Sequence, residues 1–404
     1  MIPLDEAQAH VIDRCPPLPV VSMPLRAARG LVTAEGVTSP EQIPPFDNTA
    51  VDGFAVRASD TAVAGVEGDD GSASLTIVDT IAAGGAPSIP VEPGQAIRIM
   101  TGAPMPDGAD AVAMVEWTSV DGDTVTIDQA VSEGNAVRHA GEDLQPGDAV
   151  FEPGTELTPG HLGVLASIGR YEVKVGKRPR VGVFSTGDEL VEGSQPLEPG
   201  QIRDSNRHTL LALADRDGFE AIDLGMIPDD EDQIEAAVRS GAADCDALLT
   251  SGGVSMGDYD YVKAVLSRIA DMRWMQVAIK PAKPFAFGLM GDTPVFGLPG
   301  NPVSSMVSYE LFARPGLRSM MGHTQLHRPR VAGVAGQDWR RGPDGKTHFV
   351  RVRIDSSGGE YSVVSAGGQG SHQLTAMAGA DALAIVPDGD GFAQGDDMEF
   401  FWVN

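Results

Sequence analysis

The sequence predicts a multidomain protein in which a doubly wound α/β domain stands between an all-β module and a small C-terminal β-barrel. Strand and helix patterns alternate across residues 178–322, as in a parallel sheet covered by helices. Short β-like runs separated by turns fill residues 46–140, and a second series fills residues 327–404. A chain of 404 residues has room for about two to four such domains.

The first part of the chain predicts a linking domain interrupted by the β-rich module. Residues 3–14 have the pattern of a short amphipathic helix, and residues 16–45 are punctuated by proline. A mixed pattern resumes at 141–177, where Thr158 is a suitable N-cap for a helix. We therefore assign 1–45 with 141–177 to an extended N-terminal linking domain, with the first 25 residues free to pack elsewhere, and 46–140 to an inserted β-rich domain.

The central domain is predicted at 178–326. Its first strand is a continuous apolar run, as buried parallel strands are. Strands are predicted at 181–185, 221–227, 247–250, 274–279 and 295–298, and helices at 204–217, 229–240, 258–270 and 302–314. The remaining residues, 327–404, are predicted to form the small barrel.

The charge balance restricts the partners. The chain has 29 basic and 57 acidic residues, a formal net charge of −28. A field of this sign repels nucleic acid and anionic lipid, so neither is expected as a partner, and an anion site has to be a local cluster of donors. The two cysteines form neither a disulfide framework nor a zinc site. Without a signal-like start or a long apolar window, the chain is expected to be cytoplasmic.

Three unusual loops follow predicted strands, at 185–189, 251–258 and 298–304. Ligands of open parallel sheets bind beyond the carboxyl ends of the strands. The second loop has glycines directly before a predicted helix, where backbone N–H groups can approach an anion. It matches neither the Walker A pattern nor the dinucleotide fingerprint. The pattern favours an anion-binding edge, with glycines that serve only the turn as the alternative.

Two lysines in a proline-rich segment indicate an oxyanion site. Lys280 and Lys283 follow a predicted strand and are held by Pro281 and Pro284. In so acidic a protein this pair suits an anion, although two ordinary surface lysines are the alternative. Carboxylates also recur beside glycines, and those that converge in space could bind Mg²⁺, whereas isolated ones are solvated surface charges. These carboxylates are Asp52, Asp143, Glu189, Asp229 and Asp260.

Eight segments together resemble the MoeA family, which includes the E domain of gephyrin. They are PPFDNTAVDGFAVR (44–57), RIMTGAPMPDGADAVAMVE (98–116), GEDLQPGD (141–148), FSTGDEL (184–190), LLTSGGVSMGDYDYVK (248–263), AIKPAKPFAFG (278–288), FGLPGNPVSS (296–305) and GGQGSH (367–372). They occur in order and span nearly the whole chain. The resemblance implies a homodimer whose central domain is similar to MogA, the adenylyltransferase of the preceding step and a possible partner.

The reaction implied by the resemblance is the last step of molybdenum cofactor synthesis. Adenylylated molybdopterin and molybdate would enter, Mg²⁺ would assist, the phosphoanhydride would be cleaved and AMP would leave. The scaffold role of gephyrin, alone or in addition, is one rival interpretation, and the MogA-like adenylyltransferase step is another. The domains on both sides of the α/β domain argue against the second rival. Tungstate, a tetrahedral dianion of similar size, stays an alternative substrate.

The resemblance also implies roles for individual residues. The pterin and its phosphates would be bound by Ser251, Gly252, Gly253, Ser255, Gly257, Pro299, Gly300, Asn301 and Pro302. Mg²⁺ would be held by Glu189, Asp229 and Asp260, and molybdate by Lys280, Lys283, Ser304, Arg351 and Ser371. Asp52, Thr101 and Asp143 would complete the site from the partner subunit.

For three of these residues, a position without any role in binding is the alternative. Arg351 alternates with valines on a predicted strand and could simply face solvent, while Ser371 and Thr101 could serve only turns. The chain departs from common family residues at Ala282, often Gly, at Phe54, often Tyr, and at Met100, often Phe. None of these departures removes a charged group from the predicted site.

Overall fold

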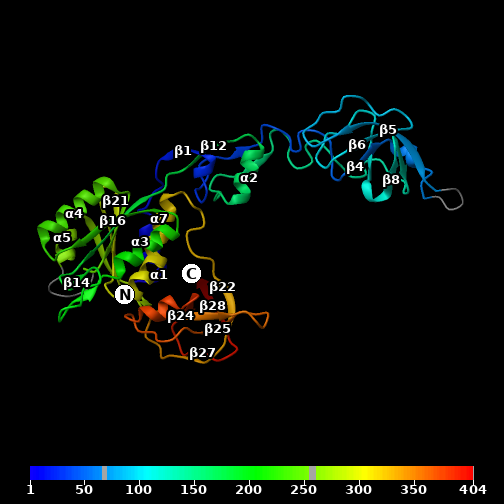
Figure 1. The fold of residues 1–404 in the computed structure, drawn as a ribbon. Coiled ribbons are helices and arrows are strands. Elements are labelled where there is room, and N and C mark those ends of the chain that lie inside the picture. Colours follow the sequence, from blue (N-terminus) through cyan, green and yellow to red (C-terminus); the bar gives the residue numbers. More distant parts are fainter. Residues whose placement is uncertain (66–70, 254–260, 404) are drawn as a thin grey trace. The chain divides into compact units, whose positions relative to one another are not determined.

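The computed structural model describes residues 1–65, 71–253 and 261–403. They form two compact units, shown in Figure 1. The first unit comprises Met1–Ala34, Gly154–Thr158 and Val173–Asn404, and the second comprises Glu35–Pro153 and Pro159–Glu172. The four domains expected from the sequence divide the chain more finely, and their limits stay predictions. Within the described residues, no helix is both long and apolar enough to cross a membrane.

The second unit is built on a six-stranded sheet in the order β7-β4-β6-β5-β9-β8. Its strands are β4 (Gly53–Val56), β5 (Ala73–Ile81), β6 (Gln95–Ile99), β7 (Ala111–Met114), β8 (Thr118–Asp121) and β9 (Thr124–Ile127). Both faces of the sheet are covered, because the neighbours Phe54 and Ala55 belong to two separate hydrophobic clusters. A β-carbon at Gly53 would lie 2.2 Å from the carbonyl oxygen of Ala113, so the close approach of β4 and β7 requires glycine there.

Short pairings complete the second unit. Strand β2 (Val37–Thr38) pairs with β11 (Ala149–Phe151), and β3 (Asn48–Thr49) pairs with β10 (Val137–Arg138). Helix α2 (Pro159–Ser167) begins directly after Thr158, as its expected N-cap position requires. The helix packs through His161, whose ring centroid lies 4.7 Å from that of Phe151.

The first unit begins with α1 (Leu4–Ile12), which packs on α7 (Arg314–Met320). At Gly316 of α7 a β-carbon would lie 3.0 Å from both Val11 Cγ1 and Cys15 Sγ, so a small residue allows this close packing. Strand β1 (Val20–Pro24) pairs with β12 (Glu172–Gly176). Residues 1–34 thus belong to the first unit.

The α/β sheet has the order β16-β13-β17-β21-β20-β18. Its strands are β13 (Arg180–Thr186), β16 (Glu220–Ile227), β17 (Ala247–Ser251), β18 (Asp271–Gln276), β20 (Pro284–Met290) and β21 (Thr293–Leu298). The first four strands in this order are parallel, whereas β20 is antiparallel to both of its neighbours. Sequence patterning missed β20, because its apolar residues directly follow the lysine segment. The predicted strand at 274–279 is divided between β18 and β19 (Ile279–Lys280).

Helices cover both faces of this sheet, as Figure 1 shows. On one side, α4 (Glu231–Asp244) and α5 (Tyr261–Ile269) pack against the strands through a cluster that includes Ile234, Val265 and Phe184. On the other side lie α3 (Asn206–Arg216) and α6 (Pro302–Ser308). A π-helical segment, Tyr309–Ala313, joins α6 to α7, so the helix expected at 302–314 becomes irregular in its last turn and then continues as α7.

The C-terminal strands close into a five-stranded barrel, as expected for residues 327–404. Its strands are β22 (Val331–Ala335), β24 (Thr347–Asp355), β25 (Ser362–Ser365), β26 (Ala382–Val386) and β28 (Asp397–Trp402). The ring closes because β24 pairs with β26 as well as with β25. The core contains Val352, Val363 and Phe400. Strand β19 adds to β24 in parallel, which joins the lysine segment to the barrel.

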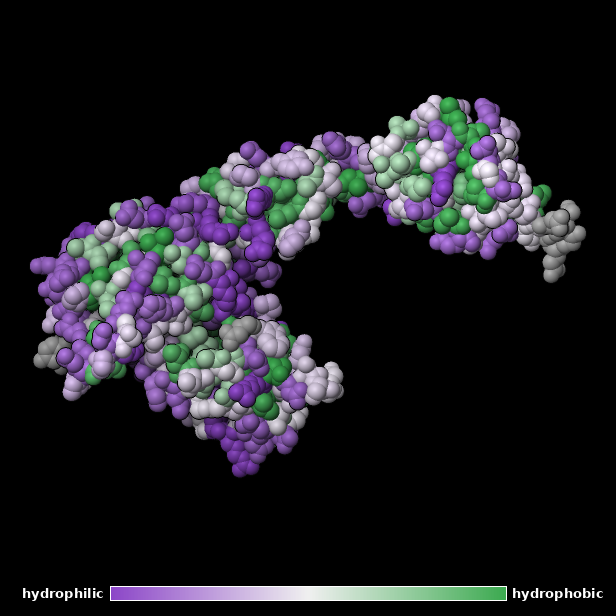
Figure 2. Space-filling view, in the orientation of Figure 1, coloured by the Kyte–Doolittle hydropathy of each residue, from purple (hydrophilic) through white to green (hydrophobic). Residues whose placement is uncertain are grey.

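The first unit also contains several shorter elements. They are β14 (Leu190–Val191), β15 (Ile202–Arg203), β23 (Trp339–Arg340), β27 (Gly391–Phe392) and α8 (Leu374–Ala378). Figure 2 shows hydrophilic residues spread over the visible face of this unit, with hydrophobic residues between them.

Candidate functional site

The carboxyl edge of the parallel strands contains a topological switch point between β13 and β17. The chain passes from β13 to β16 on one side and then returns to β17 on the other, which opens a crevice where ligands of such sheets bind. The N–H of Gly252 donates to the carbonyl oxygen of Leu298 at 3.1 Å. A β-carbon at Gly252 would lie 3.3 Å from the carbonyl oxygen of Thr186. The loops after β13, β17 and β21 therefore meet at one edge.

The described start of the glycine loop is closely packed. Gly253 has φ of 71°, and a β-carbon there would lie 2.2 Å from the β-carbon of Val262 on α5. Glycine is thus required at this position for the turn itself, which is the alternative considered for these glycines. Three predicted site residues of the same loop, Ser255, Gly257 and Asp260, lie outside the described residues.

A side chain that the sequence did not single out joins two of the loops. The amide nitrogen of Asn206, at the start of α3, donates to Ser251 Oγ and to the carbonyl oxygen of Gly300, both at 2.7 Å. In the loop after β21, Asn301 occupies the N-cap position of α6 and Pro302 the first helical position. No local signal marks Asn206, because its partners are 45 and 94 positions away in the chain.

A buried ionic cluster fixes the start of α3. Asp204 Oδ2 accepts from Ser185 Oγ at 2.5 Å and from Arg207 Nε at 3.0 Å. Arg207 also bonds Asp223 and lies 2.9 Å from a carboxylate oxygen of Glu192. Burial opposes the charge of Arg207, but the hydrogen bonds that it donates to these carboxylates raise the pKa of Arg207 above its ordinary value. This arginine is only 2% exposed and carries its own counter-ions.

Two of the three predicted Mg²⁺ ligands are described and lie on neighbouring loops. Glu189 follows β13 and is exposed, and Asp229 follows β16. The backbone N–H of Asp229 donates to Asp188 Oδ1 at 3.1 Å, which ties the two loops together. Asp188 is a residue that the sequence analysis left unassigned. In the part of the chain that the structure describes, no group of three His, Cys, Asp or Glu side chains is assembled for a metal.

These carboxylates nevertheless fit the way proteins usually bind Mg²⁺. The ion commonly takes one or two carboxylates, and substrate phosphates and waters supply its other ligands. Glu189 and Asp229 could hold it together with Asp260, and Asp188 would keep their loops in register. When bound, Mg²⁺ would neutralise part of the negative charge of a phosphoanhydride.

The lysine segment leaves the sheet at β19. Lys280 pairs in register with His348 of β24, and the carbonyl oxygen of Lys283 accepts from the N–H of Val277 at 2.8 Å. Between the lysines, Ala282 is buried and has φ of 71°, a left-handed conformation that favours glycine. Both lysine side chains are exposed, and neither forms an ion pair with any described residue.

Arg351 of β24 is completely buried, with 0% of its surface exposed. The alternative that it faces solvent is therefore wrong. Its Nη2 donates to the carbonyl oxygens of Gly368 and Gly370, at 2.6 and 3.2 Å. Among the described residues, its Nε and Nη1 have no hydrogen-bond partner, and no carboxylate pairs with the guanidinium. Burial lowers the pKa of Arg351 below its ordinary value.

The glycine-rich barrel loop at 367–373 joins Arg351 to α6. Gln369, which the sequence analysis did not single out, accepts from the N–H of Arg351 and donates to its carbonyl oxygen, both at 3.0 Å. The carbonyl oxygen of Ser371 accepts from the N–H of Val303 at 3.1 Å, beside the buried Ser304. The loop thus connects the strand of Arg351 with the start of α6, and Ser304, Arg351 and Ser371, three of the five residues predicted for molybdate, lie on these joined segments.

The second unit contains the other predicted site residues. Asp52 Oδ1 accepts from both the backbone N–H and the hydroxyl of Thr101, each at 2.7 Å. These bonds lower the pKa of Asp52 below its ordinary value, and the carboxylate is exposed and ionised. Thr101 thus contacts Asp52 directly, and its role beyond the turn stays a prediction. Asp143 is exposed, and its N–H donates to the carbonyl oxygen of Ile43 at 2.9 Å. No described hydrogen bond joins Asp143 to Asp52 or Thr101.

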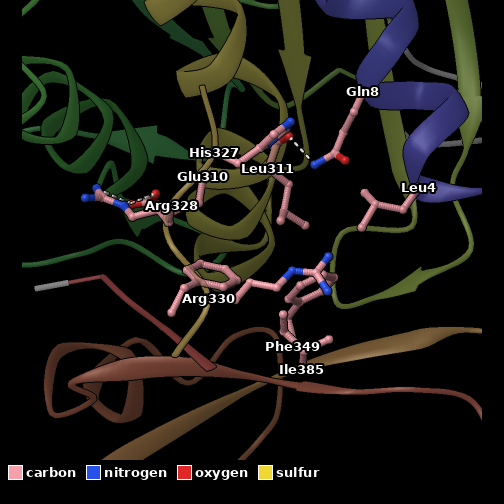
Figure 3. A pocket seen from close by; sticks show the side chains of 10 residues that line it. Leu4, Gln8, Glu310, Leu311, His327, Arg328, Arg330, Phe349 and Ile385 are labelled. Carbon is pink, nitrogen blue, oxygen red and sulfur yellow. Dashed lines mark hydrogen bonds and ion pairs between the residues drawn. The ribbon is translucent and has the colours of Figure 1, made fainter. Parts of the chain in front are cut away.

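A separate pocket lies between α1, the π-helical segment and the barrel, as Figure 3 shows. Leu4, Leu311 and Phe349 give it an apolar lining. Gln8 Nε2 donates to the carbonyl oxygen of Leu311 at 3.0 Å, and Arg328 Nε donates to Glu310 Oε2 at 2.9 Å. None of the predicted site residues is among those that line it, so this pocket is distinct from the carboxyl edge of the sheet.

Family models cover nearly the whole chain. The MoeA N-terminal region, domains I and II, matches residues 2–169, a probable molybdopterin binding domain matches 182–319, and the MoeA C-terminal region, domain IV, matches 333–401. The molybdopterin molybdenumtransferase of Haemophilus influenzae is 37% identical over 96% of this chain and 94% of its own length. The chain belongs to the MoeA family.

Similarity to further proteins supports the assignment to the MoeA family. Molybdopterin molybdenumtransferase 2 of Mycobacterium tuberculosis is 40% identical over 94% of this chain and 93% of its own length. The crystal structure of the molybdopterin biosynthesis MoeA protein from Pyrococcus horikoshii superposes with a TM-score of 0.83 at 28% identity and covers 100% of both chains. In MoeA terms, the glycine loop lies in the molybdopterin binding region, and Arg351 lies in domain IV.

Proposed function

We propose that this MoeA protein is a molybdopterin molybdenumtransferase of molybdenum cofactor biosynthesis, which inserts molybdate into adenylylated molybdopterin and releases AMP. The names of full-length relatives support the activity. The presence of Lys280, Lys283, Asp260 and Arg351 favours an enzyme over a protein that acts only as a scaffold.

The observation that carries the proposal is the buried guanidinium of Arg351. A buried cation without a counter-ion is costly, and this one has two nitrogens that no described residue satisfies. A tetrahedral dianion would supply both the missing charge and the missing acceptors. Molybdate is such an ion, and it is a substrate of the proposed reaction rather than a resident cofactor.

We place molybdate beside Arg351, with Ser304 and Ser371 as neutral donors. The contact between Val303 and Ser371 keeps these two serines together. Lys280 and Lys283 would add charge from the segment that leads out of β19, the strand paired with β24. Exposed lysines gain charge-assisted hydrogen bonds to an oxyanion without first breaking an internal ion pair.

The adenylylated pterin is assigned to the switch-point crevice. Backbone N–H groups of the glycine loop would contact its phosphates. The assigned residues are Ser251, Gly252, Gly253, Ser255, Gly257, Pro299, Gly300, Asn301 and Pro302. Glu189, Asp229 and Asp260 would hold Mg²⁺ where the phosphoanhydride lies, so the protein would orient the bond to be broken and offset its charge.

Reconstitution of the reaction tests the proposal directly. Purified protein with adenylylated molybdopterin, Mg²⁺ and molybdate should release AMP in step with cofactor formation, and omission of molybdate should stop both. Asp260→Asn keeps the size of the side chain and removes its charge, so AMP release should fall by on the order of 100-fold or more. Asp232→Asn, on the first turn of α4, is the matched control and should be active. Wild-type turnover by Asp260→Asn would remove Asp260 from the mechanism.

We also propose that the protein works as a homodimer in which Asp52, Thr101 and Asp143 of one subunit serve the site of the other. An isologous two-fold dimer permits such exchange. Asp52→Ala and Asp260→Ala chains should each be inactive alone. Mixed chains should regain up to about a quarter of wild-type activity, because half of the random dimers are hetero, each with one intact site. No recovery after confirmed subunit exchange would exclude the shared site.

The cellular setting follows from the proposed substrate. We propose that the protein is cytoplasmic and receives its adenylylated substrate from a MogA-like adenylyltransferase. The labile phosphoanhydride favours direct transfer between the two proteins. Co-purification of the two proteins, and faster turnover with the coupled enzyme than with free substrate at equal concentration, would support this. Equal rates from both sources would argue against transfer.

A further inference from the structure

We infer that Asn206 is a positioning residue for this reaction: its carboxamide fixes the spacing between the end of β17 and the loop after β21, and so the width of the crevice. This inference rests on the proposed function for the crevice's occupant. It concerns a residue to which the family resemblance assigned no role, and it requires no contact between Asn206 and the substrate.

The turn that leads into α3, from Asp204 to Asn206, contacts the carboxyl ends of three parallel strands at once. Ser185, near the end of β13, donates to Asp204 at 2.5 Å. Two residues further on, Asn206 donates to Ser251, the last residue of β17, and to Gly300 after β21. The turn therefore links the three strand ends that border the crevice through side-chain hydrogen bonds.

The chemistry of the amide sets its orientation. The carbonyl oxygen of Gly300 can only accept a hydrogen bond, so the amide nitrogen of Asn206 has to face it. That nitrogen has two hydrogens, and the two bonds at 2.7 Å use both of them. An aspartate at this position would have the same shape but no donors, and its charge would face the Gly300 carbonyl oxygen. Donation, rather than size, is therefore the property that holds the two loops.

The buried cluster below makes this connection rigid. The carboxylate of Asp204 is bonded to Ser185 Oγ and to Arg207 Nε, and Arg207 is bonded in turn to Asp223. The start of α3 is thus held by side-chain bonds of Asp204 and Arg207, which flank Asn206 in the sequence. Because the helix start cannot shift easily, the amide holds its partners at a fixed separation instead of following them.

A fixed separation matters because the crevice has to align a phosphoanhydride with the carboxylates of neighbouring loops. Misplacement by about 1 Å can reduce a rate on the order of 100-fold. Loss of the Asn206 bonds should therefore lower kcat more than it raises KM, because the binding groups all remain while their spacing is no longer fixed.

The structural half of the inference can be measured without any ligand. Hydrogen–deuterium exchange of the full chain should show faster exchange in peptides covering 248–253 and 298–302 in both Asn206→Ala and Asn206→Asp, by on the order of 10-fold. The control is Ser205→Ala, because the Ser205 side chain makes no capping bond within the described helix. Its exchange should equal that of wild type. Unchanged exchange in both Asn206 variants would overturn the inference, whatever the activity.

The functional half uses the reconstituted reaction. We expect kcat to fall on the order of 10- to 100-fold in Asn206→Ala and Asn206→Asp, with a smaller change in KM. Faster exchange with wild-type kcat would show that the bonds hold the loops without serving the reaction, and would overturn the role. An inactive wild-type chain would refute the proposed function, and the exchange result would still decide whether Asn206 holds the loops.

Discussion

Two buried arginines of the first unit have opposite surroundings. Arg207, in the first turn of α3, is enclosed by the carboxylates of Asp204, Asp223 and Glu192, which raise its pKa. Arg351, on β24, meets only the carbonyl oxygens of Gly368 and Gly370, and burial lowers its pKa. Both are at most 2% exposed, so burial alone does not distinguish them.

This difference distinguishes a buried cation that is paired within the chain from one that is left to pair with a ligand. Carboxylates within the chain surround Arg207, so removal of one partner would leave a buried charge uncompensated. Arg351 lacks such partners among the described residues, so an anion bound beside it, as proposed above, would supply the missing counter-charge. An unpaired buried cation is thus a stronger sign of an anion site than a cluster of exposed lysines.

The largest effect is expected at the paired arginine. Arg207→Met should lower the free energy of unfolding by about 3–5 kcal/mol, because Asp204 stays buried without its cation. Urea denaturation measures this change. Adding Asp204→Asn should restore part of the loss, since the stranded charge is then removed. A change below about 1 kcal/mol would show that the carboxylates do not depend on Arg207.

Arg351→Met should change ligand affinity strongly and the free energy of unfolding only slightly. Molybdate affinity, measured by calorimetry, should fall on the order of 100-fold, because charge-assisted bonds to the anion are lost. Without molybdate, the free energy of unfolding should change by less than about 1 kcal/mol, since no internal ion pair is broken. The matched control is Arg353→Met, an exposed position of the same strand, which should alter neither quantity. Destabilisation as large as that of Arg207→Met would make Arg351 structural.

A smaller effect is expected at the exposed lysine. Lys283→Ala should weaken molybdate binding roughly 10-fold or more, through loss of one charge-assisted contact worth about 1.5–3 kcal/mol. Lys346→Ala is the control, because that lysine is already paired with Asp344 at 3.1 Å. Calorimetry at matched ionic strength measures both variants. Unchanged affinity in a folded Lys283→Ala protein would exclude this lysine from the site.

The smallest effect concerns Ala282, which lies between the lysines at φ of 71°. Ala282→Gly relieves the left-handed conformation but increases the freedom of the unfolded chain and removes a buried methyl group. The free energy of unfolding should rise, by no more than about 1 kcal/mol. Thermal unfolding measures this, and molybdate affinity should stay constant. A decrease in stability would show that packing of the methyl group outweighs the backbone strain.

The sequence alone determined the architecture and the edge where chemistry is expected. Alternation of apolar residues, helix caps, and glycine or proline at turns are local signals, and they located most strands and helices of the α/β unit and the barrel. Because the carboxyl ends of parallel strands share one edge, the loops after β13, β17 and β21 could be placed together from their order in the chain. Strand β20 was not predicted, because its apolar residues directly follow the lysine segment in the sequence.

The tertiary structure decided which side chains are paired. The alternation of residues along a strand predicts on which face of the sheet Arg351 lies. Only the folded structure shows that the loop at 367–373 covers this face and that no described carboxylate pairs with the guanidinium. Asn206 likewise has no motif, because its importance comes from partners 45 and 94 residues away. Pairing of a buried polar group depends on segments that are distant in sequence and adjacent in space, and such proximity exists only once the chain has folded.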